Sequence, residues 1–486
     1  MTVMMRTTRL SLGVAALSLV LAGCAGDTAS IVAPVAPAAA PRSTGLDKAV
    51  EREHKQLVKA FGGEYRAPQM TALLTEVTNR LVKATERPEE TYRITLLDSP
   101  SVNAFALPTG RLYVTRGLLA LANDTSEIAA VMAHEIAHVT LRHAAARSEL
   151  ELRSALVSRV VADVLKDPVA GAVVQDESRV DIARFSRQQE LEADQISVKT
   201  LAAAGYDPYG AARFLTSLNR SSESRAAATG DAQKSAVDRL SSHPPTPQRI
   251  SEAKLAARRI GAPGIGGDGR DVYLTAAEGI TYGDDPADGV VRGRRFIHAR
   301  LGVTFTAPEG IALENTSRAV LGASRDGQRR LLFDAIETTE GQTLADVLTS
   351  TWTDAIETGS IESLTVNANP AATATSRGRD WSFRMAAVKI GNATYRLIMA
   401  FRSLDANAER HFRTTLDSLR GTDASDLSAI TPQRIRLVTA EPGDTAETIV
   451  RRTSAAEGAL DRFLLLNGVT EGAALKPGER YKAVVD

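Results

Sequence analysis

The run His134-Glu135-Ile136-Ala137-His138 contains three side chains that could bind and use a metal ion. In a helix, a spacing of four residues puts both histidines on one face, one turn apart, so both imidazoles can reach the same tetrahedral zinc ion. Glu135 cannot reach that ion, but it can contact a zinc-bound water and take its proton. The pattern predicts a hydrolytic zinc site directed at an amide carbonyl.

Chance accounts poorly for this run. With seven histidines in 486 residues, about 0.1 pairs are expected at one fixed spacing, and about 0.01 once an acidic residue must follow the first histidine. Two histidines that only cap or pack a helix are therefore the weaker interpretation.

A catalytic zinc ion needs a third protein ligand and one open position. The metzincin arrangement is excluded, because Leu141 and Ala144 stand where that class has glycine and histidine. His143 is one residue out of register, and we interpret it as a histidine on the helix surface.

The segment 188–194 offers a better third ligand. Glu190 and Asp194 share a helix face one turn apart. Glu190 can bind zinc, and Asp194 can accept a hydrogen bond from a ligand imidazole and so fix its tautomer. Glu192 is expected to point elsewhere, into solvent.

Four motifs in order extend this pattern: NAFALPTGRLYVTRGLL (103–119), NDTSEIAAVMAHEIAHVTLRHAAAR (123–147), QELEADQISVKTLAAAGYDP (189–208) and SHPPTPQRI (242–250). Together they resemble the gluzincin metallopeptidase family of the CAAX prenyl protease, HtpX and the BepA-like periplasmic proteases. The resemblance covers about residues 46–258 and implies one Zn²⁺ per chain, with Glu135 as general base and His134, His138 and Glu190 as ligands. Prenyl protease and HtpX cross the membrane several times, whereas this chain lacks such apolar runs, so it is similar to the BepA-like branch.

His243, in the SHPP turn, has two possible functional roles and one structural role. It could donate a hydrogen bond to the oxyanion of the reaction, or occupy the open coordination position as an inhibitory plug. Alternatively, it only fixes the turn before the helix expected over 246–258.

Two strands are expected before the metal motif, over 92–97 and 103–115, the second with a turn at Pro108-Thr109-Gly110. The hairpin could present an edge strand, Asn103, Ala104 and Phe105, that holds an extended peptide by main-chain hydrogen bonds. An ordinary structural hairpin is the alternative.

The expected fold class is multidomain, with a mainly α zincin-type (α+β) peptidase domain that contains a small β-hairpin or sheet. Leu73, Val77 and Leu81 recur at four-residue spacing and predict an amphipathic helix that stops before Pro88. Asp124, with Glu127 three residues later, predicts the capped start of the helix that carries the metal motif.

The chain holds one cysteine, Cys24, which excludes disulfides and cysteine metal sites in the folded body. Residues 1–23 form a basic start and a short apolar run, and Leu21-Ala22-Gly23-Cys24 matches the lipobox of bacterial lipoproteins. We expect a signal peptide over 1–23, lipid on Cys24 and an Ala/Pro-rich tether over 24–45. Ala25, which is not aspartate, favours the outer membrane.

Composition predicts further boundaries along the chain. The peptidase domain is expected over 46–259, followed by linkers over 260–285 and 422–434 and, between them, an α+β domain over 286–421. That domain resembles PsbP-like proteins and shows no catalytic constellation. Residues 435–486 resemble a LysM module of βααβ fold, which could bind peptidoglycan or only pack on its neighbours.

Equal numbers of basic and acidic residues, 58 each, and few aromatic residues argue against nucleic acid as a partner. The sequence predicts a lipid-anchored zinc metalloendopeptidase on the periplasmic face of the outer membrane of a Gram-negative bacterium, acting on unfolded or misassembled envelope proteins. The alternative is an assembly factor or chaperone with a normally plugged site and C-terminal domains that dock on the cell wall.

Overall fold

The computed structural model describes residues 44–165, 168–229, 243, 245–316, 319–339, 341–350, 352, 356–428, 430–454, 456 and 458–485. Two compact units divide the chain, Met1–Glu51 and Arg52–Asp486. In the first unit only the start of α1 (Thr44–Ala60) is described. Cys24, the predicted signal peptide and most of the predicted tether therefore lie outside the described residues.

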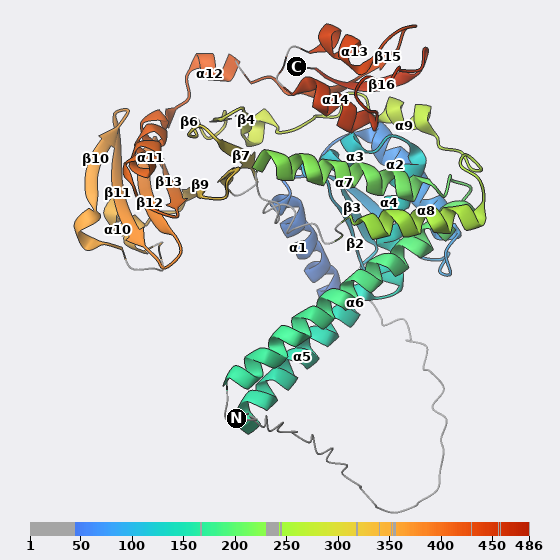
Figure 1. Cartoon of the computed structure of the whole chain (residues 1–486), viewed down its shortest axis with the longest axis horizontal. Coiled ribbons are helices and arrows are strands. Elements are labelled where there is room, and N and C mark those ends of the chain that lie inside the picture. Colours follow the sequence, from blue (N-terminus) through green and yellow to red (C-terminus); the bar gives the residue numbers. More distant parts are fainter. Residues whose placement is uncertain are drawn as a thin grey trace, which may run out of the picture. The chain divides into compact units, whose positions relative to one another are not determined.

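The first part of the second unit is mainly helical (Figure 1). Its remaining helices are α2 (Pro68–Lys83), α3 (Arg116–Leu121), α4 (Thr125–Thr140), α5 (His143–Leu165), α6 (Pro168–Ala203), α7 (Gly210–Thr229), α8 (Pro247–Ile260) and α9 (Arg270–Ala277). The predicted amphipathic helix is α2, which buries Leu74, Val77 and Leu81 and ends before Pro88.

A three-stranded sheet lies against these helices, with the strand order β1-β3-β2. It consists of β1 (Arg93–Leu97), β2 (Ala104–Leu107) and β3 (Arg111–Thr115). The predicted hairpin is β2–β3, and Gly110 in its turn has a φ of +75°, which favours glycine. Strand β1 adds to the hairpin in parallel with β3, so β2 stays at the edge of the sheet.

Helix α4, which carries the metal motif, crosses the hydrophobic core and is buried over most of its length. Asp124 caps it, because an oxygen of its carboxylate accepts a hydrogen bond from the Glu127 N–H at 2.7 Å. The Glu127 carboxylate accepts from the Asn123 N–H at 2.8 Å, one residue before the position that a capping box uses.

The segment 260–285, expected as a linker, is packed into the same core as α4. Its helix α9 buries Tyr273, Leu274 and Ala277 completely, and the Tyr273 hydroxyl donates to the carbonyl of Leu119. The composition that predicted a linker, GAPGIGG at 261–267, covers only the turn before α9. The part of the predicted linker that contains α9 is therefore a packed helix.

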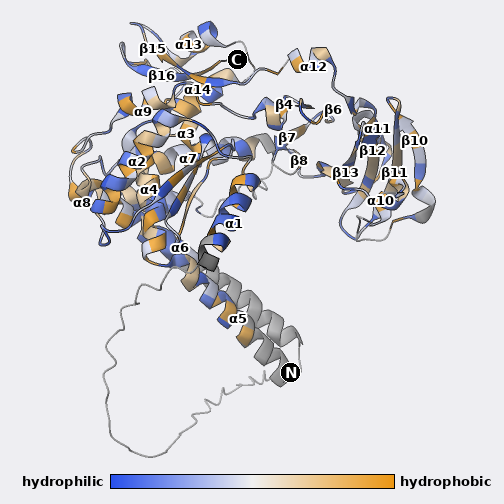
Figure 2. Ribbon diagram, turned by 180° about the vertical axis from the view of Figure 1, so that it is seen from behind, coloured by the Kyte–Doolittle hydropathy of each residue, from blue (hydrophilic) through white to orange (hydrophobic). Residues whose placement is uncertain are grey.

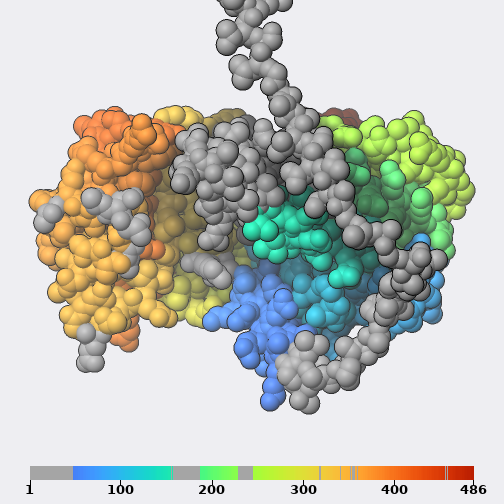
Figure 3. All heavy atoms as spheres, turned by 90° about the horizontal axis from the view of Figure 1, so that it is seen from below, coloured from blue at the N-terminus to red at the C-terminus, as the bar shows by residue number. Residues whose placement is uncertain are grey.

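A β-sheet-rich region follows, with a four-stranded sheet in the order β14-β6-β5-β4 and a seven-stranded antiparallel sheet in the order β10-β11-β12-β13-β9-β8-β7. Its elements are η1 (Pro286–Asp288), β4 (Val290–Arg292), β5 (Arg295–His298), β6 (Val303–Thr306), β7 (Ile311–Asn315), β8 (Val320–Ser324), β9 (Arg329–Ile336), α10 (Leu344–Ser350), η2 (Thr358–Ser360), β10 (Glu362–Val366), β11 (Asn369–Arg377), β12 (Ser382–Ile390), β13 (Ala393–Phe401), α11 (Ala406–Ser418) and β14 (Arg420–Gly421). Phe412 and Leu416 of α11 are buried in its hydrophobic core. Its yellow and orange spheres are contiguous on the face shown in Figure 3.

The last elements are α12 (Ala424–Ser428), β15 (Arg434–Thr439), α13 (Ala446–Thr453), α14 (Ala459–Asn467) and β16 (Arg480–Val485). β15 and β16 pair in antiparallel fashion, so the order from β15 is βααβ. Segment 422–434, expected as a linker, contains α12, whose Asp426 is fully buried and paired with Arg295 and Arg420.

Among the described residues, no helix combines the length and apolar composition that a membrane span needs. Hydrophilic residues recur along the helices in Figure 2.

Candidate metal centre

Four side chains from three segments converge at the C-terminal half of α4. His134 and His138 come from one face of α4, Glu190 from α6, and His243 from the turn before α8. One ligand atom from each lies within 4.8 Å of the others. His134 and Glu190 are buried, and the other two are partly buried.

The spacing of these four atoms fits a tetrahedral metal ion. His134 Nε2 lies 3.0 Å from His138 Nε2 and 3.4 Å from His243 Nδ1. The Glu190 oxygens lie 3.4 Å from His134 Nε2, 3.5 Å from His138 Nε2 and 2.8 Å from His243 Nδ1. Ligand distances of about 2.0–2.2 Å to zinc imply about 3.3–3.6 Å between tetrahedral ligands, so the cluster is close to that size.

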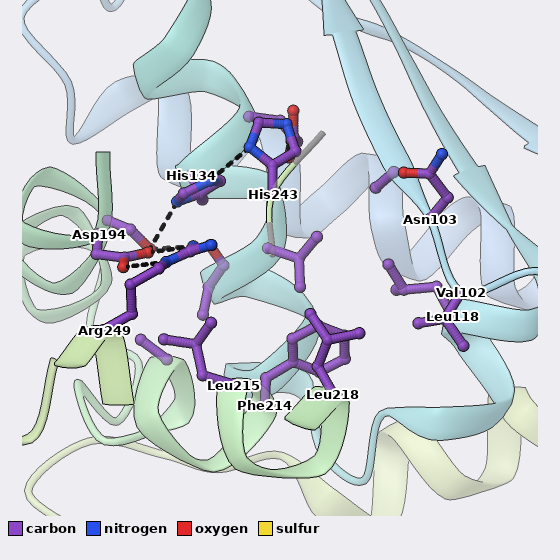
Figure 4. A pocket seen from close by; sticks show the side chains of 16 residues that line it. Val102, Asn103, Leu118, His134, Asp194, Phe214, Leu215, Leu218, His243 and Arg249 are labelled. Carbon is purple, nitrogen blue, oxygen red and sulfur yellow. Dashed lines mark hydrogen bonds and ion pairs between the residues drawn. The ribbon is translucent and has the colours of Figure 1, made fainter. Parts of the chain in front are cut away.

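Asp194 and Arg249 support two members of the cluster. Asp194 Oδ1 lies 3.0 Å from His134 Nδ1, so it can accept that proton and leave Nε2 free for a metal. Arg249 of α8 donates to both Asp194 oxygens at 2.7 and 2.8 Å, and its third nitrogen lies 2.9 Å from Glu190. Figure 4 shows His134, Asp194 and Arg249 joined in this order.

The buried charges of this site favour a divalent cation. Three carboxylates, those of Glu135, Glu190 and Asp194, face one guanidinium, that of Arg249, and all four are at least nine-tenths buried. With neutral imidazoles the group carries two excess negative charges, which is costly in a buried site unless a cation balances them. Two histidines, a carboxylate and a further histidine match the ligand preferences of zinc.

The pKa shifts of the clustered side chains also bear on the charge that this site favours. Burial alone would lower the pKa of His134, but the adjacent Asp194 and Glu190 raise it to about 9. Burial and the neighbouring histidines lower the pKa of His138 to about 2. Burial would raise the pKa of Glu190, but its contacts with His134 and His243 hold it far below its usual value. Positive charge is therefore favoured between His134 and Glu190.

The interpretation of His143 as a surface histidine is wrong. Its side chain is buried, with 6% of its surface exposed, and its Nδ1 lies 2.9 Å from Nδ1 of His138. Glu192 is exposed, as expected, yet its carboxylate lies 3.6 Å from His143 Nε2. The spacing of His143 was compared only with the position of a third metal ligand, and this comparison does not indicate a contact with His138.

A pocket of about 60 Å³ opens beside the cluster. In Figure 4, His134 and His243 lie at the top of the view, and Phe214, Leu215 and Leu218 of α7 lie at the bottom. Val102, Asn103 and Leu118 lie at the right. Ala104 of the edge strand and Glu135 also line it. One carboxylate oxygen of Glu135, Oε1, lies 3.7 Å from His243 Nε2. His134 and His243 of the cluster therefore share one pocket with Glu135 and with Ala104 at the start of the edge strand. Phe105 stacks on Tyr113 instead.

Arg249 is the residue of this centre that sequence reasoning missed entirely. It lies inside the quoted SHPPTPQRI motif, but its spacing from Asp194 gives no sign of the contact. A basic residue in the first turn of a helix, where the helix dipole disfavours positive charge, is the one signal that could have drawn attention to it.

Comparison with known proteins agrees with this geometry. The model of peptidase family M48 matches residues 68–257. The beta-barrel assembly-enhancing protease of Escherichia coli is 28% identical over 221 residues, 43% of this chain and 43% of that protein. Mitochondrial metalloendopeptidase OMA1 of Arabidopsis thaliana is 30% identical over 187 residues, 37% of this chain and 36% of that protein. The chain thus spans less than half the length of these relatives.

Among solved structures, the cyanobacterial PsbP of Synechocystis sp. PCC 6803 is similar at a TM-score of 0.22 and 12% identity, over 29% of this chain and 98% of that chain. Similarity at this level carries no weight for the fold of residues 286–421, and the PsbP-like and LysM-like assignments stay predictions. The match over residues 68–257 and the complete His–His–Glu–His cluster identify this part of the chain as a metallopeptidase domain of family M48.

Proposed function

We propose that this protein is a zinc-dependent metalloendopeptidase, anchored by lipid on Cys24 to the periplasmic face of the outer membrane, which cleaves unfolded or misassembled envelope proteins. The observation that carries the proposal is the convergence of His134, His138 and Glu190 around one point, with Glu135 beside it in the pocket. The peptide-hydrolysing activity rests on that geometry.

The chemistry divides between the metal and the chain. A zinc ion held by His134, His138 and Glu190 would act as a Lewis acid, which would polarise the scissile carbonyl and lower the pKa of water. Glu135 lines the same pocket, and its carboxylate takes the proton of the attacking water and passes it to the leaving amine nitrogen. Asp194 holds the His134 ring by its Nδ1, and Arg249 holds Asp194.

The edge strand β2 can hold an extended polypeptide. The main-chain oxygen of Asn103 accepts from the Thr115 N–H, and its N–H donates to the Thr115 hydroxyl, so Asn103 is already bonded within the sheet. Because bonding alternates along an antiparallel strand, the main-chain groups of Ala104 and Ala106 face away from β3. These groups can bind a substrate with little dependence on its sequence.

The apolar wall of the pocket adds one side-chain preference. Val102, Leu118, Phe214, Leu215 and Leu218 surround space next to the cluster. A substrate with an apolar side chain beside the cleaved bond would bury it there, which is worth about 1.5–3 kcal/mol for a residue of leucine size. Such side chains are exposed in unfolded proteins, which agrees with the proposed substrate class.

The envelope location rests on two arguments of different kinds. The lipobox at Cys24 predicts the anchor. The relative in Escherichia coli is named for enhancing β-barrel assembly, at 28% identity. An outer-membrane protein as substrate or partner follows from these arguments together.

The test is zinc content and casein cleavage for wild type and Glu135→Gln. We expect about one zinc per chain in both proteins, and cleavage that falls about 10²–10⁴-fold in the variant because the proton acceptor is lost. Thermal unfolding of both proteins is the control for folding. Wild type without stoichiometric zinc would refute the site.

The second candidate function is a chaperone or assembly factor with a plugged site. It is favoured by His243, whose Nδ1 lies 2.8 Å from Glu190 and 3.4 Å from His134, where a fourth ligand would stand. Glu135→Gln separates the two functions in cells, because an envelope role that survives the substitution does not depend on cleavage.

His243→Ala separates the two roles of His243. A rise in casein cleavage supports the plug, since removal of the side chain would open a coordination position for substrate. A fall supports oxyanion stabilisation, and an unchanged rate excludes both. Zinc content must be measured with each rate, so that metal loss is distinguished from a lost donor.

A further inference from the structure

The two histidines of α4 differ in the group that lies next to Nδ1, the ring nitrogen that faces away from the metal site. His134 Nδ1 faces the Asp194 carboxylate at 3.0 Å. Among the described side chains, no carboxylate lies at that distance from His138 Nδ1; its neighbour is Nδ1 of His143, at 2.9 Å. The two rings stand nearly edge to face, with planes at 78° and centroids 4.8 Å apart. This is hydrogen-bond geometry between two imidazoles.

The backbone brings His143 back to His138. Helix α4 ends at Thr140, and Arg142 adopts a φ of +54°, a left-handed conformation that is uncommon for a residue with a Cβ. The chain therefore turns sharply, and His143 begins α5. The Gln189 side-chain amide donates to the His143 carbonyl at 3.0 Å. Gln189 precedes Glu190, so the turn is tied directly to the α6 segment that supplies the carboxylate ligand.

The direction of the imidazole–imidazole bond follows from the metal site. A lone pair on His138 Nε2 is needed for a metal ion, so the ring proton sits on Nδ1. His143 Nδ1 must then accept, which leaves its own proton on Nε2. Glu192 lies 3.6 Å from that nitrogen, too far for a hydrogen bond but close enough for its charge to favour a proton there.

We propose that His143 is a positioning residue for the metal centre: it accepts the His138 Nδ1 proton, fixes the tautomer and ring orientation of this ligand, and is itself oriented by Glu192. The inference rests on the proposed zinc function and adds a residue to it. The centre then has two supports, a carboxylate for His134 and a neutral imidazole for His138.

The test compares His143→Ala with His143→Asn. The Asn side-chain oxygen can occupy the place of His Nδ1 and accept the same proton, whereas Ala offers no acceptor. Purified, zinc-loaded proteins are titrated with a competing chelator, and zinc release and the visible spectrum of the cobalt-substituted protein are recorded. Loss of such a support lowers metal affinity about 10–100-fold.

We expect His143→Ala to release zinc at a chelator concentration at least tenfold lower than wild type and to change the cobalt spectrum, and His143→Asn to stay within about threefold of wild type. Glu192→Gln should weaken zinc binding by about fivefold or less, because this carboxylate is half exposed. His298→Ala is the matched control, since His298 is equally buried, at 6% exposed, but belongs to β5.

Two results would overturn the proposal. Equal zinc retention in wild type, His143→Ala and His143→Asn would show that the acceptor is not needed. Equal loss in both variants would show a packing role that no acceptor restores. Neither result contradicts the proposed function. That function is contradicted instead if the wild-type protein binds no zinc.

Discussion

Helix α4 has buried charged groups at both ends, and the two groups differ in whether the protein itself balances them. At the N-terminal end, acidic and basic side chains pair with each other or with main-chain groups. At the C-terminal end, acidic side chains outnumber basic ones among the described residues, and imidazole nitrogens face each other. The comparison distinguishes buried charged groups that stabilise the fold from buried charged groups that are suited to bind a metal ion.

At the N-terminal end, the charged side chains are paired within the protein. Arg213 of α7 binds Asp124 at 2.9 Å and Asp207 at 2.5 Å. Lys482, from the distant strand β16, is fully buried, and its ammonium donates to the carbonyls of Ala120, Leu121 and Ala122 at 2.7–3.2 Å. The three ammonium protons of Lys482 thus have three carbonyl acceptors. These carbonyls lie at the C-terminal end of α3, where the helix dipole favours a cation.

Within the described part of the chain, the carboxylates at the C-terminal end are not fully paired with basic side chains. Among the described residues, Arg249 is the one guanidinium that faces Glu190 and Asp194. With neutral imidazoles and the Glu135 carboxylate included, this group keeps two excess negative charges. The N-terminal end should therefore govern stability, and the C-terminal end should govern metal binding.

The largest expected effect is that of metal removal. A strong chelator should abolish casein cleavage, and zinc should restore it. The melting temperature should fall by about 5 °C or more, because a ligand at a hundred times its Kd contributes about 2.7 kcal/mol to stability. Unchanged activity and melting temperature in metal-free protein would contradict the assignment of this end to metal binding.

The next effect is that of Lys482→Met. Methionine has a similar length but no donor, so three buried carbonyls lose their partner and Glu127 loses a nearby positive charge. We expect the free energy of unfolding to fall by about 1–3 kcal/mol, measured by denaturant unfolding, with one zinc per chain retained.

Lys476→Met is the matched control for this substitution. Lys476 lies in the same C-terminal segment, but its side chain is 77% exposed, so its loss should change stability by less than about 0.5 kcal/mol. If Lys482→Met loses zinc while remaining folded, the two ends of α4 are coupled and the comparison fails.

The smallest expected effect is that of Asp124→Ala. The substitution removes the cap of α4 and one of the three carboxylates paired with Arg213, while Asp207 and Glu127 keep their contacts with it. We expect a loss of about 1 kcal/mol in thermal unfolding, typical of a helix cap. Chelator titration should give the zinc affinity of wild type, and a tenfold weaker affinity would show that the cap also positions the metal motif.

Local patterns were enough to predict several elements. The four-residue repeat of Leu73, Val77 and Leu81 predicted α2, and the turn residues 108–110 predicted the β2–β3 hairpin. These predictions depend on neighbours within one or two turns of chain. The parallel pairing of β1 with β3 and the burial of α9 depend on contacts between segments that no local pattern relates.

The same division holds for the metal centre. The spacing of His134 and His138, and of Glu190 and Asp194, is decided by the helical repeat of 3.6 residues, so the sequence by itself determined which side chains share a face. Tertiary structure alone decided that His143 turns back to His138, that Arg249 binds Asp194, and that Lys482 reaches α3. The physical reason is that the helical repeat determines the relative directions of side chains only within one helix. Contacts between buried charged groups of different segments depend on how those segments pack.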